Sequence, residues 1–385
     1  MLGPERNTAV DLIRLLALVG ICVVNVPFLA LPVETTLAAP EALPDRLAVF
    51  AVEALFQSKF FLLFSFLFGW GLHVQEALAR RSGASFAGRY GRRLGALALM
   101  GCLHAVLVFT GDILLIYALL GLLIWPFLRF GPRALVRLAG AMIPLAAISL
   151  LGLSVMLTEV TLPVEGAGLD GGFIEATRAR LHDWPETLGF LLLFQGPLAF
   201  GAIALGLAAG KSDFFSPDSP GRRALRRAVP GLAVAGIPIN ALYAASMGGL
   251  IPPEQELLSL AGFVGIALGG PMLSAVYLHL ILGLADRLRL PGILEAAGRN
   301  SLSVYVLQGV VAGFVFGAYG LGLFDRIGWA GLVPVSLLVA ALAILAVGVI
   351  ARRSGRGPLE IVLRRVTYAG KTRPRPQAAH PGDAL

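Results

Sequence analysis

Long apolar runs divide this chain, and they constrain its fold more than any other feature. Each run has roughly 20 residues, the length that an α-helix needs to cross the hydrocarbon core of a bilayer. None of the runs alternates polar with apolar residues as a barrel strand does, so only helices can satisfy their backbones in lipid. We therefore predict an all-α polytopic membrane bundle of about ten transmembrane helices. The runs cover residues 12–31, 55–75, 93–110, 112–129, 134–157, 187–210, 227–248, 257–283, 299–320 and 330–350.

The composition excludes a soluble protein. Of the 385 residues, 57% are hydrophobic and only 14% are charged, with a mean hydropathy of +0.81. The formal charge of +8 needs no nucleic-acid partner, because basic loops beside a membrane account for it. Cys22 and Cys102 both lie within apolar runs and have no metal-ligand spacing. We expect neither a disulfide framework nor a metal site.

The basic residues predict the orientation. If the N-terminus is cytoplasmic, most of the 31 Lys and Arg residues fall on cytoplasmic segments. This asymmetry predicts that both termini are cytoplasmic and that the number of spans is even. The exceptions are Arg46, Lys59, Arg178, Arg180 and Arg326.

Residues 1–370 are predicted to form a single transmembrane domain, with the first apolar run retained rather than cleaved as a signal peptide. Residues 371–385 form a basic, Pro-rich tail that should be disordered and touch anionic lipid. Residues 159–186 make the one sizeable outer excursion. The part that reads FIEATRARLHDW fits either an interfacial amphipathic helix or a lid over an outer cavity.

The most informative stretch runs from Arg92 to Tyr117. It reads as a helix, a two-residue turn and a second helix that opens on Asp112, where a carboxylate suits the free N–H groups of a helix N-terminus. His104 and Tyr117 fall at similar depths within the two helices. Because an ionisable group in a membrane is costly, we take His104, Asp112 and Tyr117 as candidate catalytic residues. The alternative is a packed histidine bonded to a carbonyl.

Other polar residues within the runs are candidates for binding substrate. If they converge, they line a polar shaft, although helices also use such residues simply to pack. Asp11 and Arg14 share a helix face and form either an interfacial ion pair or an anchor for an anion. Lys59 either snorkels to the interface or faces His104 and Asp112. The candidates are Asp11, Arg14, Asn25, Lys59, Gln195, Asn240, Arg299, Asn300 and Glu360, while Ser65, Ser303, Tyr305 and Gln308 fall between them.

Five patches together resemble a known family, the YeiB-like bacterial membrane proteins, whose C-terminal part is the domain of unknown function 418. The resemblance spans residues 11–370, with the C-terminal domain at about 225–370. Leu15, Val304 and Ile361 depart from the family pattern. The patches read DLIRLLALVGICVVN, KFFLLFSFLFGWG, RRLGALALMGCLHAVLVFTGDILLIYALLG, GRNSLSVYVLQG and GPLEIVLRRVTYAG.

The resemblance implies a bacterial inner-membrane protein distantly similar to integral membrane acyltransferases, which take an acyl group from cytoplasmic acyl-CoA to an acceptor across the membrane. Acyl-CoA would then be the donor, with no permanently bound cofactor, and an envelope sugar or lipid the acceptor. Histidine would act as general base or carry the acyl group. Asp112 would orient it, Tyr117 and Asn25 would stabilise an oxyanion, and the inner arginines Arg14, Arg92, Arg93 and Arg299 would hold phosphates.

Two other functions remain open from the sequence. A polar shaft with helices interrupted at Pro197 and Pro271 also fits a small-solute transporter or permease. A non-catalytic lipid-binding or envelope-assembly protein fits as well. The chain lacks a Walker motif, GxSxG, HExxH and a dinucleotide fingerprint, so nucleotide hydrolysis, serine hydrolysis and zinc chemistry have no support.

Overall fold

The structure is a computed structural model that describes residues 8–81, 85–159 and 170–369. Every regular element in these ranges is a helix, which confirms the all-α prediction for them. The tail at 371–385 lies outside the described residues. In chain order the elements are α1 (Thr8–Asn25), α2 (Pro27–Ala30), α3 (Val33–Leu37), α4 (Leu43–Leu55), α5 (Phe60–Arg81), α6 (Phe86–Leu107), α7 (Leu114–Leu123), the 3-10 helix η1 (Trp125–Arg129), α8 (Pro132–Glu159), α9 (Phe173–Lys211), α10 (Pro220–Met247), α11 (Glu256–Ala285), α12 (Gly292–Arg299), α13 (Ser301–Phe316), α14 (Trp329–Ser354) and α15 (Pro358–Thr367).

Seven segments of the described chain are long and apolar enough to cross a membrane. The expected run at 112–129 is only the ten-residue α7 followed by η1, and at about 15 Å this helix covers half of a hydrocarbon core. The run at 299–320 begins after Asn300, which separates α12 from α13. Hydropathy counts apolar residues and misses such breaks, so the number of ten is not confirmed.

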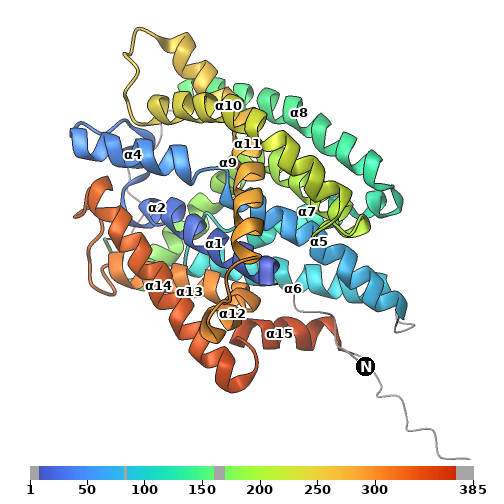
Figure 1. Cartoon of the computed structure of the whole chain (residues 1–385). Coiled ribbons are helices and arrows are strands. Elements are labelled where there is room, and N and C mark those ends of the chain that lie inside the picture. Colours follow the sequence, from blue (N-terminus) through green and yellow to red (C-terminus); the bar gives the residue numbers. More distant parts are fainter. Residues whose placement is uncertain (1–7, 82–84, 160–169, 370–385) are drawn as a thin grey trace, which may run out of the picture.

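Helix α1 lies at the centre of the bundle, and α8 lies at its edge (Figure 1). Of the apolar windows of these two helices, 67% of that containing α1 is buried but only 17% of that in α8. Helix α1 contacts α5, α12, α13 and α14, whereas α8 contacts mainly α9 and exposes Leu145, Ile148 and Leu151. Exposed apolar side chains on a peripheral helix are expected where lipid is the solvent.

Helix α9 is longer than the sequence predicts. Its 39 residues extend about 58 Å, nearly twice the hydrocarbon thickness. Residues 173–184, expected as a separate interfacial helix or a lid, are instead its first turns. Arg180 within them is only 4% exposed and donates to the Leu107 carbonyl and the Tyr319 hydroxyl, both at 3.0 Å. This guanidinium therefore fixes the extension against the C-terminal end of α6.

The two ends of the bundle differ in charge. At the end that we call the basic end, α5 and α14 finish and α6 begins, and arginines accompany each of these termini. Helix α15 lies there too, where Arg92 of α6 donates to the Thr367 carbonyl at its C-terminus. At the other end, α1 passes into α2, and the following residues carry Glu34, Glu41 and Asp45. Figure 1 shows α2 and α4 on one side of α1 and α15 on the other.

Candidate functional site

The turn between α6 and α7 places a carboxylate at a helix N-terminus. Asp112 Oδ1 accepts hydrogen bonds from Leu114 N at 2.8 Å and Leu115 N at 3.1 Å. These amides have no partner within the helix, and the dipole of α7 favours a negative charge here. Gly101 of α6 permits the close approach, because a Cβ there would lie 2.5 Å from Leu115 N and 2.7 Å from Asp112 Oδ1. Local capping chemistry therefore fixes Asp112.

The second oxygen of Asp112 binds the imidazole of His104. Asp112 Oδ2 lies 2.8 Å from His104 Nδ1, and the two residues are only 2% and 4% exposed. An ionised carboxylate only accepts, so the Nδ1–H of His104 donates and Nε2 of the neutral ring keeps its lone pair. The Tyr305 hydroxyl adds a 3.4 Å contact to the same oxygen and accepts from Ile113 N at 3.3 Å. The carboxylate thus sets the tautomer and orientation of the ring.

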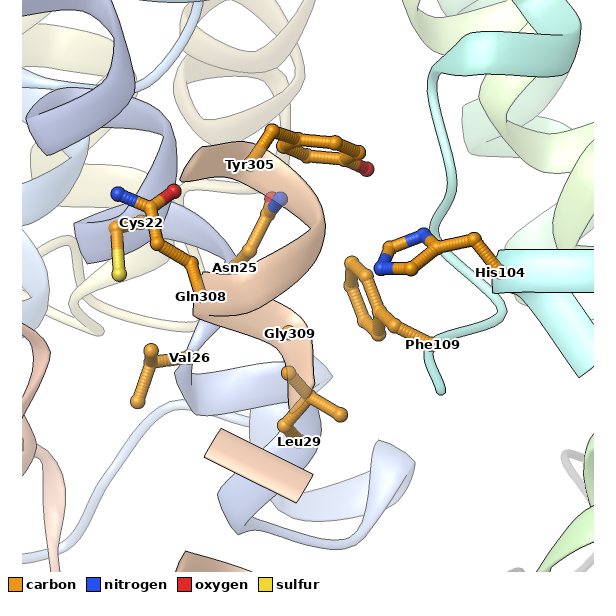
Figure 2. Close-up of a pocket in the computed structure, with 9 residues that line it drawn as sticks. All are labelled: Cys22, Asn25, Val26, Leu29, His104, Phe109, Tyr305, Gln308 and Gly309. Atoms are coloured by element: carbon orange, nitrogen blue, oxygen red, sulfur yellow. The ribbon is translucent and has the colours of Figure 1, made fainter. Parts of the chain in front are cut away.

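The other ring nitrogen of His104 points away from the carboxylate. Nε2 is buried and has no hydrogen-bond partner among the described residues. It meets α13 at Gly309, where a Cβ would lie only 2.7 Å away. The ring borders a cavity of about 20 Å³, space for a group the size of a water molecule or a hydroxyl. Figure 2 shows the imidazole facing α13 and the end of α1 across this cavity.

The cavity combines an apolar wall with a second unpaired acceptor. Cys22, Val26, Leu29 and Phe109 supply the wall, and Asn25 contributes an amide. Gln308 donates through Nε2 to the Leu18 carbonyl at 3.2 Å, which assigns its Oε1 as the acceptor. That Oε1 is also buried and unpartnered among the described residues. A buried acceptor without a donor is costly, so the site favours a ligand that brings an O–H or N–H group.

Tyr117 does not reach this cavity. Its hydroxyl donates to the Phe61 carbonyl at 3.1 Å and accepts from Ser65 Oγ at 3.0 Å, and its ring stacks on Phe64 and Phe68. Similar depth along two helices, as the sequence suggests for Tyr117 and His104, does not specify the face of α7 on which Tyr117 lies. The tyrosine whose hydroxyl contacts Asp112 is Tyr305 of α13.

Lys59 differs from both expectations for it. It is completely buried, so it does not snorkel, and Nζ donates to the Glu53 carbonyl at 2.9 Å rather than facing His104. The residue sits at the break between α4 and α5, beside the Glu53 carboxylate. Lys59 therefore belongs to a separate polar cluster that closes this break.

Asn300 and Glu360 hold helices together at the basic end. Glu360 Oε1 accepts from Leu302 N at 2.9 Å and from Ser303 N at 3.1 Å at the start of α13, and Oε2 accepts from Ser303 Oγ. Asn300 Oδ1 accepts from Gly357 N at 2.7 Å, and Ser303 Oγ accepts from Leu359 N at 3.1 Å. We call these contacts of Asn300, Ser303 and Glu360 the α13–α15 latch. The polar atoms of the latch are used on backbone groups or on each other.

The remaining basic-end candidates fall into two groups. Arg14 pairs with Asp11 over 3.7 Å and lies near Arg93 and Glu360, so these charges gather at the end of the central helix. Arg93 Nε is buried without a hydrogen-bond partner among the described residues. Arg299 is exposed and bonds back to the Glu295 carbonyl of its own helix. Arg299 therefore stays apart from this cluster.

Two further candidates lie outside the cavity. Asn240 is buried on α10 and donates to the Gly236 carbonyl at 2.8 Å, while its Oδ1 finds no partner in the described residues. Gln195 lies on α9 and is not among the residues that line the cavity. Of the two possibilities that the sequence leaves open, a shared polar shaft or packing contacts, the described residues favour the second, because these side chains form several separate clusters.

Three residues of α13 belong to the site although sequence reasoning did not assign them to it. Tyr305, Gln308 and Gly309 all line the cavity. Their spacing of three and four residues puts them on one helix face. A polar Tyr and Gln on one face of an apolar helix, followed by a Gly that admits a close neighbour, was the available signal.

The chain is similar to known proteins over most of its length. Residues 209–370 match the family described as "Protein of unknown function (DUF418)". YxaH of Bacillus subtilis (strain 168) is 28% identical, with 95% of each chain aligned. YeiB of Escherichia coli (strain K12) is also 28% identical, over 94% of this chain and 96% of YeiB. No solved structure matches. The family match contains Tyr305, Gln308 and Gly309, whereas His104 and Asp112 precede it.

Proposed function

Because the chain belongs to the YeiB-like, DUF418 family of membrane proteins, we propose that it is a membrane-embedded acyltransferase in which His104 is the general base. Family membership names no reaction, so the proposal depends on the site. One observation carries it: His104 lines a cavity and its Nε2 has no partner among the described residues, while a carboxylate holds its Nδ1. This is the arrangement that activates a hydroxyl or amine for attack.

Each residue around the cavity has a separate role in the proposed reaction. His104 Nε2 takes the proton of an acceptor O–H or N–H as that atom attacks the thioester carbonyl of an acyl-CoA. Asp112 stabilises the imidazolium that forms, and the departing thiolate recovers the proton. Asn25 lines the same cavity and can donate to the oxyanion, while Gln308 Oε1 can accept a second hydrogen bond from the acceptor. The Tyr305 hydroxyl is already used in holding Asp112.

The donor would enter from the basic end. Arg93 and His104 lie on the same helix about 16 Å apart along its axis, a length that an extended pantetheine arm can cover. Arg93 and Arg14 offer guanidinium groups to the CoA phosphates. The proposal includes a bacterial inner membrane, with the basic end and both termini on its cytoplasmic side, as the basic residues predict.

The test measures CoA thiol released from acetyl-CoA by the purified full chain in lipid nanodiscs, with bacterial envelope extract as the source of acceptor. We expect the wild type to release thiol and His104→Gln to release it at least about 10³-fold more slowly. His279→Gln is the matched control, because His279 is another histidine within an apolar helix but does not line the cavity. This control should retain the wild-type rate within about twofold.

Two results would contradict the proposal. One is a His104→Gln protein that keeps full activity. The other is a folded wild-type protein that releases no thiol from acetyl-CoA or a longer acyl-CoA. Movement of a solute across the membrane of vesicles that contain this inactive protein would favour the transporter instead. Thermal unfolding of each variant, followed in the same lipid, separates lost chemistry from lost fold.

A further inference from the structure

One face of helix α10 is uncovered along much of its length. Helix α10 lies at the edge of the bundle (Figure 1), and only 22% of its apolar window is buried. Its opposite side packs against α11, where a Cβ at Gly236 would lie 3.0 Å from Met272 Cβ. On the uncovered face, Val234 and Ile237 are 78% and 59% exposed. Because α10 is long and apolar enough to cross a membrane, these side chains meet lipid.

Two arginines continue this face toward the start of the helix. Arg226, Arg227, Pro230, Val234 and Ile237 are all exposed, and helical geometry places them within about 100° of one another around the axis. We call these five residues the α10 stripe. The stripe therefore carries two guanidinium groups at one end and apolar side chains along the rest.

The charged end of the stripe lies at the basic end of the bundle. Arg222, in the first turn of α10, donates to Asp286, which directly follows α11, at 2.6 Å. The next helix, α12, begins at Gly292, where a Cβ would lie 3.9 Å from the guanidinium carbon of Arg352 in the last turn of α14. These contacts place the start of α10 beside the end of α14.

The charge of the two arginines is not compensated within the part of the chain that the structure describes. Neither Arg226 nor Arg227 makes a side-chain hydrogen bond or ion pair there, and Asp286 already pairs with Arg222. The first turn of α10 contains no acid. The helix dipole is positive at this terminus, so it adds to the repulsion between the two guanidinium groups. An anion beside them would relieve both effects.

The length of the stripe matches one leaflet of a membrane. From Arg227 to Ile237 the helix advances about 15 Å, half of a hydrocarbon core that is about 30 Å thick. A phospholipid combines a phosphate for the arginines with a chain of this length for Val234 and Ile237. A free phosphate would leave the apolar part uncovered, and a zwitterionic headgroup would not compensate two positive charges. The stripe therefore favours an anionic lipid.

We propose that the α10 stripe binds an anionic phospholipid of the leaflet at the basic end. Arg226 and Arg227 hold the headgroup phosphate, because a planar guanidinium donates two parallel N–H groups to phosphate oxygens. One acyl chain lies along Pro230, Val234 and Ile237. The inference concerns the outer surface of the bundle and does not depend on the acyltransferase proposal.

The test measures dissociation constants by native mass spectrometry of the purified full chain in a neutral detergent. We expect dioleoyl phosphatidylglycerol to bind at least about tenfold more tightly than dioleoyl phosphatidylcholine, which has the same chains. Ammonium acetate at about 0.5 M should remove most of this preference, because it screens exposed charges. Glycerol phosphate at the concentration of the lipid should not displace phosphatidylglycerol, because it lacks the chains.

Three variants assign the binding to the stripe. Arg226→Gln/Arg227→Gln should weaken phosphatidylglycerol binding at least about tenfold and leave phosphatidylcholine within about twofold. Val234→Asn should weaken both lipids alike, by about threefold, because it changes the surface that contacts the chain. Arg178→Gln/Arg326→Gln is the matched control, since it removes the same charge from exposed positions in the first turns of α9 and before α14, at the opposite end. This control should keep the preference within about twofold.

Several results would overturn the inference: equal binding of the two lipids, an unchanged preference in Arg226→Gln/Arg227→Gln, an equal loss in the control variant, or displacement by glycerol phosphate. If Val234→Asn changes neither lipid, the chain lies elsewhere and the proposed site is wrong. A lipid-free dimer of the wild type that Val234→Asn dissociates would assign this face to a second copy of the chain instead. Because every substituted side chain is exposed, each variant should remain folded, which thermal unfolding in the same detergent checks.

Discussion

The α6–α7 turn and the α13–α15 latch use the same capping chemistry, but the remaining carboxylate oxygen has a different role in each. In each, a carboxylate accepts two backbone N–H groups at the start of a helix: Asp112 at α7 and Glu360 at α13. In the latch the second oxygen is used on Ser303, whose own oxygen accepts from a backbone amide. At the turn, the second oxygen holds an imidazole that keeps one unpaired nitrogen beside a cavity. What distinguishes the candidate site from the latch is a nitrogen without a hydrogen-bond partner among the described residues, rather than burial or charge.

Asp112→Asn is expected to have the largest effect on this comparison. The amide keeps the shape and remains a good helix cap, but it no longer favours the Nδ1–H tautomer or stabilises an imidazolium. We expect acyl transfer to fall about 10³-fold while the free energy of unfolding changes by less than about 1 kcal/mol. Rates of thiol release and thermal unfolding of the same preparation check both parts. Activity within threefold of wild type would mean that the Asp112 carboxylate, like that of Glu360 in the latch, only stabilises the fold.

Gly309→Ala is expected to have an intermediate effect. A Cβ at Gly309 would lie 2.7 Å from His104 Nε2, so either the ring or α13 must move. Because small displacements of a catalytic group are costly, we expect activity to fall about tenfold. Gly95→Ala is the matched control on α6: a Cβ there meets nothing within 4 Å, and alanine favours the helix. An unchanged rate in Gly309→Ala would show that the close approach of His104 Nε2 to α13 is not needed for activity.

The part of the site that lies close together in sequence could be predicted. His104 and Asp112 are eight positions apart, so a single turn brings them together, and capping explains why the second helix begins there. The partner on α13 could not be assigned in this way. Tyr305 lies 193 residues from Asp112, and its contact depends on how α13 packs, which hydropathy does not encode. For the same reason the sequence suggests Tyr117 as a site residue, whereas its hydroxyl bonds to the Phe61 carbonyl and to Ser65.

The fold shows the same division between local and distant information. Apolar runs identify helices correctly wherever the helix is continuous, as in α8, α10, α11 and α14. They fail at Asn300, which separates α12 from α13, and at Pro126, where η1 replaces the α-helix. Proline alone does not end a helix, because α9 and α11 continue through Pro197 and Pro271, where the sequence suggests interruptions. Asn300 and Glu360 could be recognised as unusual, but their contacts join segments 57 or more residues apart. Without the packing, a residue that holds a latch and one that binds substrate look alike.

Glu360→Ala is expected to have the smallest effect on activity and a clear effect on stability. Its loss leaves the Leu302 and Ser303 amides without their acceptor at the start of α13, which should lower the free energy of unfolding by about 1–3 kcal/mol. Activity per folded molecule should stay within about twofold, since removing a negative charge beside Arg14 and Arg93 does not hinder an anionic donor. Thermal unfolding and thiol release are measured on the same sample.

Two further variants make this last result interpretable. Glu360→Gln keeps an oxygen in place of Oε1 and should recover most of the stability that Glu360→Ala loses, because the latch needs an acceptor more than a charge. Glu295→Ala removes an acid from the first turn of α12 at the same end of the bundle and should change stability by less than about 0.5 kcal/mol. If Glu360→Ala unfolds like the wild type yet loses activity, Glu360 acts on the substrate, and a carboxylate whose hydrogen bonds are all used would no longer be a sign of an architectural role.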